Sequence, residues 1–267
     1  RVNLQEAEDI VTEVRRKGYV RGFETERLAK DGRRIEVEMS LSELGPEVGT
    51  TAIMRDITTR NRAKREQEKS LVTLQKAFQG TIEAMAVTVE TRDPYTAGHQ
   101  RRVAELSCAI AHEMGLAENQ IEGLRMAGLI HDLGKISVPA EILSKPGKLW
   151  DIEFEIIMLH PETGYEILKK INFPWPVARI VLQHHERYNG TGYPDGLKGK
   201  DCLIEARIIS VADVVEAMAS HRPYRPALGL DAALEEIASK GNILYDPEIV
   251  DVCLKILQEG KFTWSTG

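Results

Sequence analysis

The feature that most constrains this chain is the helical period of its apolar residues over residues 93–260. Amphipathic helices repeat every three to four residues, whereas half-buried strands alternate, and no alternating stretch occurs in this range. Pro and Gly residues divide the range into segments of helix length. We predict helices at residues 94–114, 118–132, 150–159, 161–171, 175–187, 203–219, 231–240 and 247–258. The pattern therefore predicts a mainly α fold with one helical domain at residues 93–260.

Residues 1–57 follow a different pattern. A polar helix is predicted at residues 5–17 and strands at residues 20–28, 34–42 and 50–56. Asp31-Gly32 lies between the first two strands and favours a hairpin turn. Within residues 34–42 apolar and polar residues alternate, which predicts one buried and one wet face. One helix and three strands bury little surface, so we interpret this segment as the second half of an α/β domain. Because the chain begins at Arg1, we expect it to be part of a longer protein.

Residues 58–92 are predicted to form one helical linker, since they contain no proline and a single glycine. Its apolar residues step by three or four positions, as in an a/d seam. They are Leu71, Leu74, Phe78, Ile82, Met85 and Val89. The spacing fits either a helix packed on its own domain or a parallel coiled coil between two chains. A charged run at residues 60–69 leads into the seam, so we predict a signalling coiled coil that forms a homodimer.

Composition excludes several classes of function. The net charge of −6 leaves no basic surplus for binding polymeric nucleic acid. The three cysteines lie far apart and form no CxxC pair, which excludes a disulfide scaffold and a thiolate zinc ribbon. No apolar run approaches the roughly 20 residues that span a membrane, and no signal peptide is visible. We therefore expect a cytoplasmic protein without a membrane segment in this chain.

Side chains able to bind metal fall on the apolar faces of the predicted helices. His99 shares a helical row with Val103 and Leu106, and Asp213 shares one with Ile209. Five further residues lie on the apolar face of a predicted helix or directly beside such a position. They are His131, Asp132, His160, His184 and His185. A single histidine on such a face is often a hydrogen-bonded core residue, but a buried carboxylate without a partner is costly. A shared metal centre satisfies the whole set together.

The donor set indicates which metals this centre would take. Nitrogen and oxygen donors without thiolates suit Fe, Mn or Zn. Five histidines and two aspartates exceed the needs of one tetrahedral ion, so we predict two ions bridged by Asp132. Such two-metal sites hydrolyse phosphoesters with a metal-bridged hydroxide. His112 lies two residues past the row of His99, so we expect it to be exposed and uninvolved.

The order of several motifs resembles the HD-GYP family of HD phosphohydrolases over about residues 80–258. The motifs are residues 93–99, His131-Asp132-Leu133-Gly134-Lys135, His184-His185-Glu186-Arg187, Asn189-Gly190-Thr191-Gly192-Tyr193-Pro194 and Arg222-Pro223-Tyr224-Arg225. The resemblance implies an HD-type all-helical catalytic domain. Residues 1–57 resemble the C-terminal half of a PAS sensor domain.

The resemblance also implies an activity, which is hydrolysis of the bacterial second messenger cyclic di-GMP to pGpG and often to GMP. It assigns the metal ligands to His99, His131, Asp132, His160, His184, His185 and Asp213, with iron expected first, manganese next, and other divalent metals as alternatives. Asp132 and Lys135 would be catalytic, with Lys135 facing the scissile phosphate. Arg187, Arg222 and Arg225 would bind substrate, and the bidentate fork of arginine suits phosphate. Tyr193 would lie near a guanine or contact a signalling-protein partner at the Gly-Tyr-Pro loop.

Simpler interpretations stay open for these polar residues. Lys135 would be a helix C-terminal charge, Arg222 and Arg225 would lie in a solvated loop, and the glycines at residues 190–199 would form a surface turn. Two other functions also fit the sequence. One is a cyclic di-GMP receptor of low activity, and the other is a phosphohydrolase of a different cyclic dinucleotide.

The number of metal ions depends on the residue four positions before His99. Asp93 and Pro94 are predicted to cap and begin the helix, so Tyr95 shares a face with His99. Some HD-GYP members have Glu at this position and resemble trinuclear enzymes. A phenol with a pKa of about 10 is a poor ligand at neutral pH. We therefore predict two ions in each chain rather than three.

Overall fold

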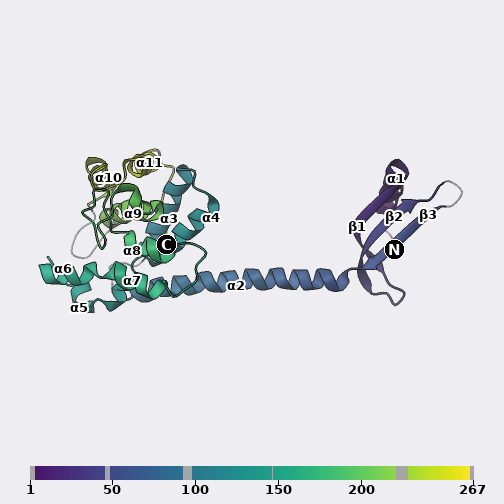
Figure 1. Cartoon of the computed structure of the whole chain (residues 1–267), viewed down its shortest axis with the longest axis horizontal. Coiled ribbons are helices and arrows are strands. Elements are labelled where there is room, and N and C mark those ends of the chain that lie inside the picture. Colours follow the sequence, from purple (N-terminus) through teal and green to yellow (C-terminus); the bar gives the residue numbers. More distant parts are fainter. Residues whose placement is uncertain (1–3, 46–48, 93–97, 146, 221–227, 265–267) are drawn as a thin grey trace. The chain divides into compact units, whose positions relative to one another are not determined.

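The computed structural model describes residues 4–45, 49–92, 98–145, 147–220 and 228–264 of the 267-residue chain (Figure 1). The chain forms two compact units, residues 1–78 and residues 79–267, and each is described by itself. Among the helices described, none combines the length and the hydrophobicity that crossing a bilayer requires.

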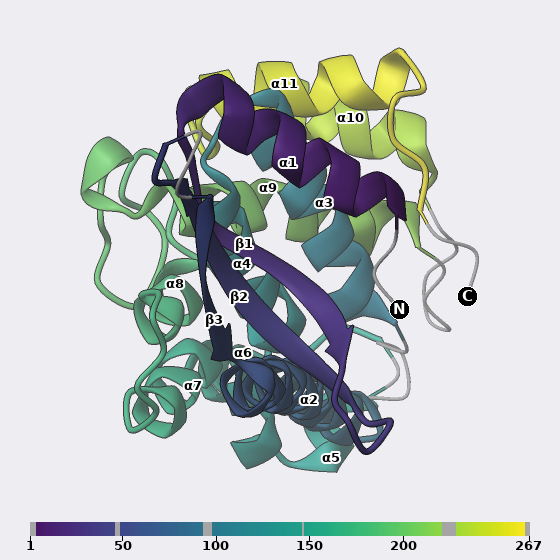
Figure 2. The same cartoon turned by 90° about the vertical axis from the view of Figure 1, so that its right-hand side faces the viewer.

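The first unit contains a three-stranded antiparallel sheet in the order β1-β2-β3. Its elements are α1 (Leu4–Lys17), β1 (Tyr19–Leu28), β2 (Arg34–Glu43) and β3 (Thr50–Asp56). Gly32 turns the first hairpin at a φ of 86°, as the Asp31-Gly32 pair predicts. The helix α1 contacts β1 and β2 (Figure 2). The predicted helix and strands of this unit are therefore confirmed to within about a residue.

Fewer side chains of this sheet are buried than the alternation of apolar and polar residues predicts. Only Val37 of β2 is buried, whereas Ile35 and Met39 are half-buried. On β3, Ile53 and Met54 are 68% and 61% exposed. One helix covers too little of the sheet to give it a complete core. The PAS-like character of the segment stays a prediction.

The long helix α2 (Thr58–Glu90) confirms the predicted helical linker. Its apolar seam divides into two parts. Ile82 and Val89 are each 2% exposed and belong to the core of the second unit. Leu71 and Leu74 are 59% and 68% exposed, so this part of the seam is uncovered in a single chain. The interpretation as a core-facing helix therefore holds for the last two turns, which belong to the unit that begins at residue 79.

The second unit is helical, and its described residues contain isolated β-bridges but no strand. The α-helices after α2 are α3 (His99–Glu113), α4 (Glu118–Ile130), α5 (Ala140–Leu143), α6 (Asp151–Met158), α7 (His160–Leu168), α8 (Val177–Gln183), α9 (Ile204–Ala219), α10 (Leu230–Ser239) and α11 (Pro247–Gln258). Two short 3₁₀ helices, η1 (Leu133–Ser137) and η2 (Gly199–Asp201), and α5 were not predicted. The predicted α-helices are found, and six of the eight end one to four residues earlier than predicted, which matters for the site.

One apolar core fills the space between these helices. Contacts join α3 to α4 and α9, and α8 to α4, α7 and α9. Its fully buried side chains include Leu106, Ile110, Leu124, Ile180 and Ile209. Burying an aliphatic side chain of this size contributes about 1.5–3 kcal/mol, so helix packing supplies most of the stability of this unit. The polar cluster described next lies within this framework.

Candidate metal centre

The predicted ligands lie where helices begin and end. His99 is the first residue of α3 and His160 is the first residue of α7. His131 directly follows α4, and His184 directly follows α8. The predicted helices at residues 118–132 and 175–187 therefore run too far, because the chain leaves the helix at each of these histidines. Asp213 is the exception, since it lies inside α9.

The five histidine rings form one connected cluster. Ring centroids are 5.5 Å apart for His99 and His131, 5.1 Å for His131 and His184, and 5.2 Å for His160 and His184. The ring of His185 lies 5.0 Å from that of His160. All of these histidines except the half-buried His185 are at most 3% exposed. The structure thus brings together histidines that are far apart in the sequence.

Asp132 lies between two groups of donor atoms. Its Oδ1 is 3.3 Å from Nε2 of His160, and its Oδ2 is 3.7 Å from Nε2 of His131 and 4.0 Å from Nε2 of His99. Among the described residues, donor atoms close enough to share an ion form three groups, which are His99/His131/Asp213, His160/His184/His185 and His131/Asp132/His184. The first two groups share no residue, and the third connects them. All seven predicted ligands occur in these groups.

Backbone carbonyls fix the orientation of three of the rings. Each ring places Nδ1 against the carbonyl oxygen three residues earlier, in the pairs His131 and Gly128 (2.8 Å), His160 and Ile157 (2.7 Å), and His184 and Val181 (2.6 Å). A carbonyl oxygen only accepts, so Nδ1 carries the proton in each pair. In the neutral ring this leaves a lone pair on Nε2, and that nitrogen points into the cluster.

These lone pairs have no hydrogen-bond donor to satisfy them. Nε2 of His131 is buried and accepts no hydrogen bond from the described residues. Nε2 of His160 and Nε2 of His184 face each other at 3.2 Å. Burial lowers the pKa of His160 to about 4 and holds that of His184 well below its usual value, so neither ring supplies a proton. A bound cation satisfies this arrangement, and the donor set therefore fits a metal.

The two aspartates supply negative charge to the cluster. Burial alone would raise both pKa values, but nearby cationic groups outweigh it. The ammonium of Lys135 holds the pKa of Asp132 well below its usual value, and the hydrogen bond from His99 does the same for Asp213. Burial also lowers the pKa of His99, but hydrogen bonds to Asp213 and Glu216 raise it to about 9. Carboxylate oxygens and imidazole nitrogens are donors that Fe, Mn and Zn accept.

The comparison with protein families identifies the helical unit. The model of the HD domain family matches residues 83–249, which is more than half of the chain. The chain belongs to the HD domain family. The motif His131-Asp132 lies within the matched range and at the centre of the cluster.

Curated relatives of this HD domain include cyclic dinucleotide phosphodiesterases. The cyclic di-GMP phosphodiesterase response regulator RpfG of Xanthomonas campestris is 41% identical over 177 residues, which cover 66% of this chain and 47% of that protein. The 3′3′-cGAMP-specific phosphodiesterase 3 of Vibrio cholerae is 37% identical over 176 residues, covering 66% of this chain and 38% of that protein. The chain therefore spans less than half the length of either relative.

A solved structure supports the fold of this HD domain. The HDG"Y"P protein Bd1817 of Bdellovibrio bacteriovorus aligns with a TM-score of 0.50 and 23% identity, over 60% of this chain and 51% of that one. The predicted fold class, mainly α with an HD-type helical domain, is confirmed.

The Lys135 side chain of the HD domain lies at the metal centre. Its Nζ is 2.7 Å from Oδ2 of Asp132, and only 17% of the side chain is exposed. This position differs from that of a solvated helix-end charge. The predicted contact of Lys135 with a scissile phosphate stays a prediction.

The structure describes two of the remaining predicted substrate residues. The guanidinium of Arg187 donates to Oγ of Ser210 at 2.9 Å and lies 5.3 Å from the ring centroid of Tyr245. The ring of Tyr193 lies 4.9 Å from that of His185, so this residue borders the cluster. Substrate binding by these residues stays a prediction. Arg222, Arg225 and residues 93–97, including Tyr95, lie outside the described residues.

Glu186 organises the loop that carries Tyr193, a role that the sequence pattern does not predict. Its carboxylate accepts backbone N–H groups from Asp195, Gly196 and Leu197 at 2.8, 3.1 and 3.0 Å. Glu186 is 4% exposed. The signal available in the sequence was its place directly after the histidine pair, ahead of a glycine-rich loop that needs acceptors for its backbone.

Gly134 permits a close contact that the HD domain needs. A Cβ at this position would lie 1.8 Å from the carbonyl oxygen of His160 and 2.6 Å from the backbone nitrogen of Gly164. We expect Gly134→Ala to lower the free energy of unfolding by about 1–3 kcal/mol, the usual cost of overpacking. The urea midpoint of the helical unit, followed by circular dichroism, measures this change.

Gly80 provides the matched control for this substitution. It lies in α2, and a Cβ there would meet nothing within 4 Å. Because alanine is the better helix former, Gly80→Ala should leave stability unchanged or raise it by up to about 1 kcal/mol. An unchanged midpoint for Gly134→Ala would contradict the close contact.

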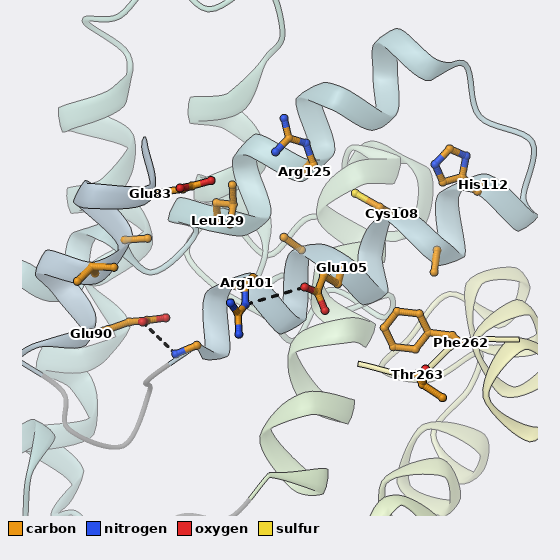
Figure 3. Close-up of a pocket in the computed structure, with 15 residues that line it drawn as sticks. Glu83, Glu90, Arg101, Glu105, Cys108, His112, Arg125, Leu129, Phe262 and Thr263 are labelled. Atoms are coloured by element: carbon orange, nitrogen blue, oxygen red, sulfur yellow. Dashed lines mark hydrogen bonds and ion pairs between the residues drawn. The ribbon is translucent and has the colours of Figure 1, made fainter. Parts of the chain in front are cut away.

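A separate pocket of about 840 Å³ lies beside α3 (Figure 3). Residues of α2, α3 and α4 line it, together with Phe262 and Thr263 near the C-terminus. None of the predicted site residues that the structure describes lines this pocket. His112 does, and its side chain is 54% exposed, which confirms the predicted exposure.

Proposed function

We propose that this chain hydrolyses cyclic di-GMP to pGpG, and on to GMP, as an HD-GYP phosphodiesterase with two metal ions. The observation that carries the proposal is the pair of separate donor groups connected by Asp132. Its relative from Xanthomonas campestris is a cyclic di-GMP phosphodiesterase. We expect iron first and manganese next, because the donors are nitrogen and oxygen without thiolate.

Residues of this chain would prepare the site for a phosphodiester. Bound divalent ions supply an acidified water and positive charge for the phosphate oxygens. Asp132 would hold both ions in place, since its two oxygens face different donor groups. Lys135 would hold Asp132 through its 2.7 Å contact and add local positive charge for the phosphate. Tyr193 offers an aromatic ring beside His185 for stacking a guanine base.

A second substrate has support from one relative. The 3′3′-cGAMP-specific phosphodiesterase of Vibrio cholerae is 37% identical to this chain. Cyclic di-GMP and 3′3′-cGAMP share the same phosphodiester ring and differ in one purine. A metal centre that binds the phosphate would not distinguish these bases, so the purine contacts would decide between the two substrates. We propose cyclic di-GMP because the relative with this activity has the higher identity of the two, 41%.

The test of this proposal is product analysis after metal reconstitution. The chain is stripped with a chelator and reloaded with Fe²⁺ under anaerobic conditions, or with Mn²⁺. We expect turnover of cyclic di-GMP to pGpG or GMP, and slower turnover of 3′3′-cGAMP. Faster turnover of 3′3′-cGAMP would assign the second substrate. Binding of cyclic di-GMP without turnover under every metal condition would identify a receptor and contradict the proposed hydrolysis.

We also propose that α2 forms a homodimer through its uncovered seam. Leu71, Leu74 and Phe78 are 59%, 68% and 38% exposed, and the heptad spacing places them on one face. Leu74→Glu combined with Phe78→Glu would place charges in the paired seam, so we expect monomers in sedimentation equilibrium. A chain of unchanged sequence that stays monomeric at high micromolar concentration would contradict the dimer.

A further inference from the structure

One histidine of the metal centre is held differently from the three that use backbone carbonyls. His99 is the first residue of α3, and the contact that the structure describes for its Nδ1 comes from a side chain. Its Nδ1 instead contacts Oε2 of Glu216, a residue of α9 that is 117 positions away. A side chain from another helix therefore does for His99 what the main chain does for His131, His160 and His184.

Glu216 is itself fixed on every side that the structure describes. Glu216 is 1% exposed. While Oε2 faces His99, Oε1 accepts hydrogen bonds from Nε of Arg102 and from Oγ of Ser220, each at 2.6 Å. Charge-assisted hydrogen bonds of this kind are stronger than neutral ones. The carboxylate is therefore held in one position before any ligand arrives.

The other nitrogen of His99 explains why this contact matters. Nε2 lies 3.2 Å from Oδ1 of Asp213. A neutral His99 ring carries one proton and can donate it to only one of two carboxylates. Nδ1 faces Glu216 and Nε2 faces Asp213. With the proton on Nδ1, Nε2 has a lone pair for an ion. With the proton on Nε2, the ring would donate to Asp213, and neither partner would be free to bind an ion there.

We propose that Glu216 is a positioning residue that sets the tautomer of His99 and thereby the affinity of the His99/His131/Asp213 group for metal. Asp213 and Glu216 are three positions apart on α9 and share a face of that helix. One helix therefore provides both a ligand and the group that orients a second ligand. Carboxylates that accept from a metal-binding histidine also raise its basicity. The inference rests on the proposed metal centre.

The first test reads the tautomer directly in the metal-free full chain, by ¹⁵N NMR of the histidine rings at a pH above the pKa of about 9 of His99, where that ring is neutral. In the unchanged chain we expect the proton of His99 on Nδ1. Glu216→Leu removes the acceptor, and we expect the proton to move to Nε2 while His131, His160 and His184 keep theirs. Glu216→Gln retains an oxygen acceptor and should restore the Nδ1 proton. The inference is overturned if His99 in Glu216→Leu keeps the Nδ1 proton, or if all four rings change together.

The second test titrates Mn²⁺ into the same proteins against a competing chelator. Mutating a residue that orients a ligand usually lowers metal affinity by about 10–100-fold. We expect one of the two ions to weaken about tenfold in Glu216→Gln and about a hundredfold in Glu216→Leu, with the other ion unchanged. Should the leucine variant fail to fold, the glutamine variant alone decides. The inference would be overturned if Glu216→Gln binds both ions as tightly as the unchanged chain, or if the affinity for both ions falls by the same factor.

Glu205 provides the matched control. It lies on α9, is 7% exposed and accepts a hydrogen bond from Nε2 of Gln120 at 2.7 Å, away from the metal centre. Glu205→Gln should bind both ions as the unchanged chain does, and weakening there would overturn the specific role of Glu216. If the unchanged chain takes up no Mn²⁺, the proposed function fails, while the NMR measurement still decides what Glu216 does to His99.

Discussion

Asp132→Ala is expected to abolish phosphodiester hydrolysis, and His131→Ala is expected to do the same. Oδ1 of Asp132 lies 3.3 Å from Nε2 of His160, and Oδ2 lies 3.7 Å from Nε2 of His131. The alanine substitution therefore removes the carboxylate that connects the donor group of His160 with that of His131. His131 is a member of two donor groups, His99/His131/Asp213 and His131/Asp132/His184, so its loss affects both. We expect turnover of cyclic di-GMP below a tenth of the unchanged rate for each variant, measured with Fe²⁺ or Mn²⁺ present.

The fold is expected to survive both substitutions. The apolar core includes Leu106, Ile110 and Leu124, which are fully buried and which neither substitution changes. Circular dichroism should therefore show the helical content of the unchanged chain. His112→Ala is the control, because that side chain is 54% exposed and lies outside the cluster, and its turnover should be nearly unchanged. Either site variant retaining a tenth of the turnover or more would contradict the assigned centre.

Removing metal is expected to abolish turnover, and restoring it should load two ions in each chain. Two groups of three donors share no residue, and Asp132 lies between them. A third ion would need a further carboxylate near His99, and the residue four positions earlier is Tyr95. Phenols titrate at about pH 10 and bind divalent ions poorly at neutral pH. Elemental analysis of the purified chain, or anomalous scattering from crystals, should give about two ions.

A substitution in one group gives this count an internal check. Of the three donor groups found among the described residues, Asp213 belongs only to His99/His131/Asp213. Asp213→Ala should therefore lower the count from about two ions to about one, while His160, His184 and His185 keep theirs. A third ion at full occupancy beside Tyr95 would show that the missing carboxylate does not control the number of ions.

Much of the ligand set was visible in the sequence for a physical reason. A histidine or aspartate on the apolar face of a helix must be buried, and a buried polar group needs a partner. His99 on the row of Val103 and Leu106 is an example, and the structure leaves it 3% exposed. The motif order then grouped these residues before any distance was known. The hairpin at Asp31-Gly32 was also local, because glycine tolerates the positive φ that the turn uses.

The seam of α2 depended on tertiary structure. A spacing of three and four places apolar residues on one face, and the same face can pack on its own domain or on another helix. Ile82 and Val89 are buried in the helical unit, whereas Leu71 and Leu74 are exposed in the single chain. Nothing in the spacing marks the change, because it depends on which helices lie beside each turn.

The sequence by itself determined the helical class of the chain, the identity of its buried polar residues and the motif that places them in the HD domain family. Tertiary structure decided where the helices end and what holds the rings. The close approach of Gly134 to the carbonyl oxygen of His160 is one tertiary contact of this kind, because it joins residues that are distant in the chain. In the sequence, Glu216 is a glutamate of a predicted helix that no quoted motif includes. Its role depends on His99, 117 positions away, because a hydrogen bond requires proximity in space that no local pattern encodes.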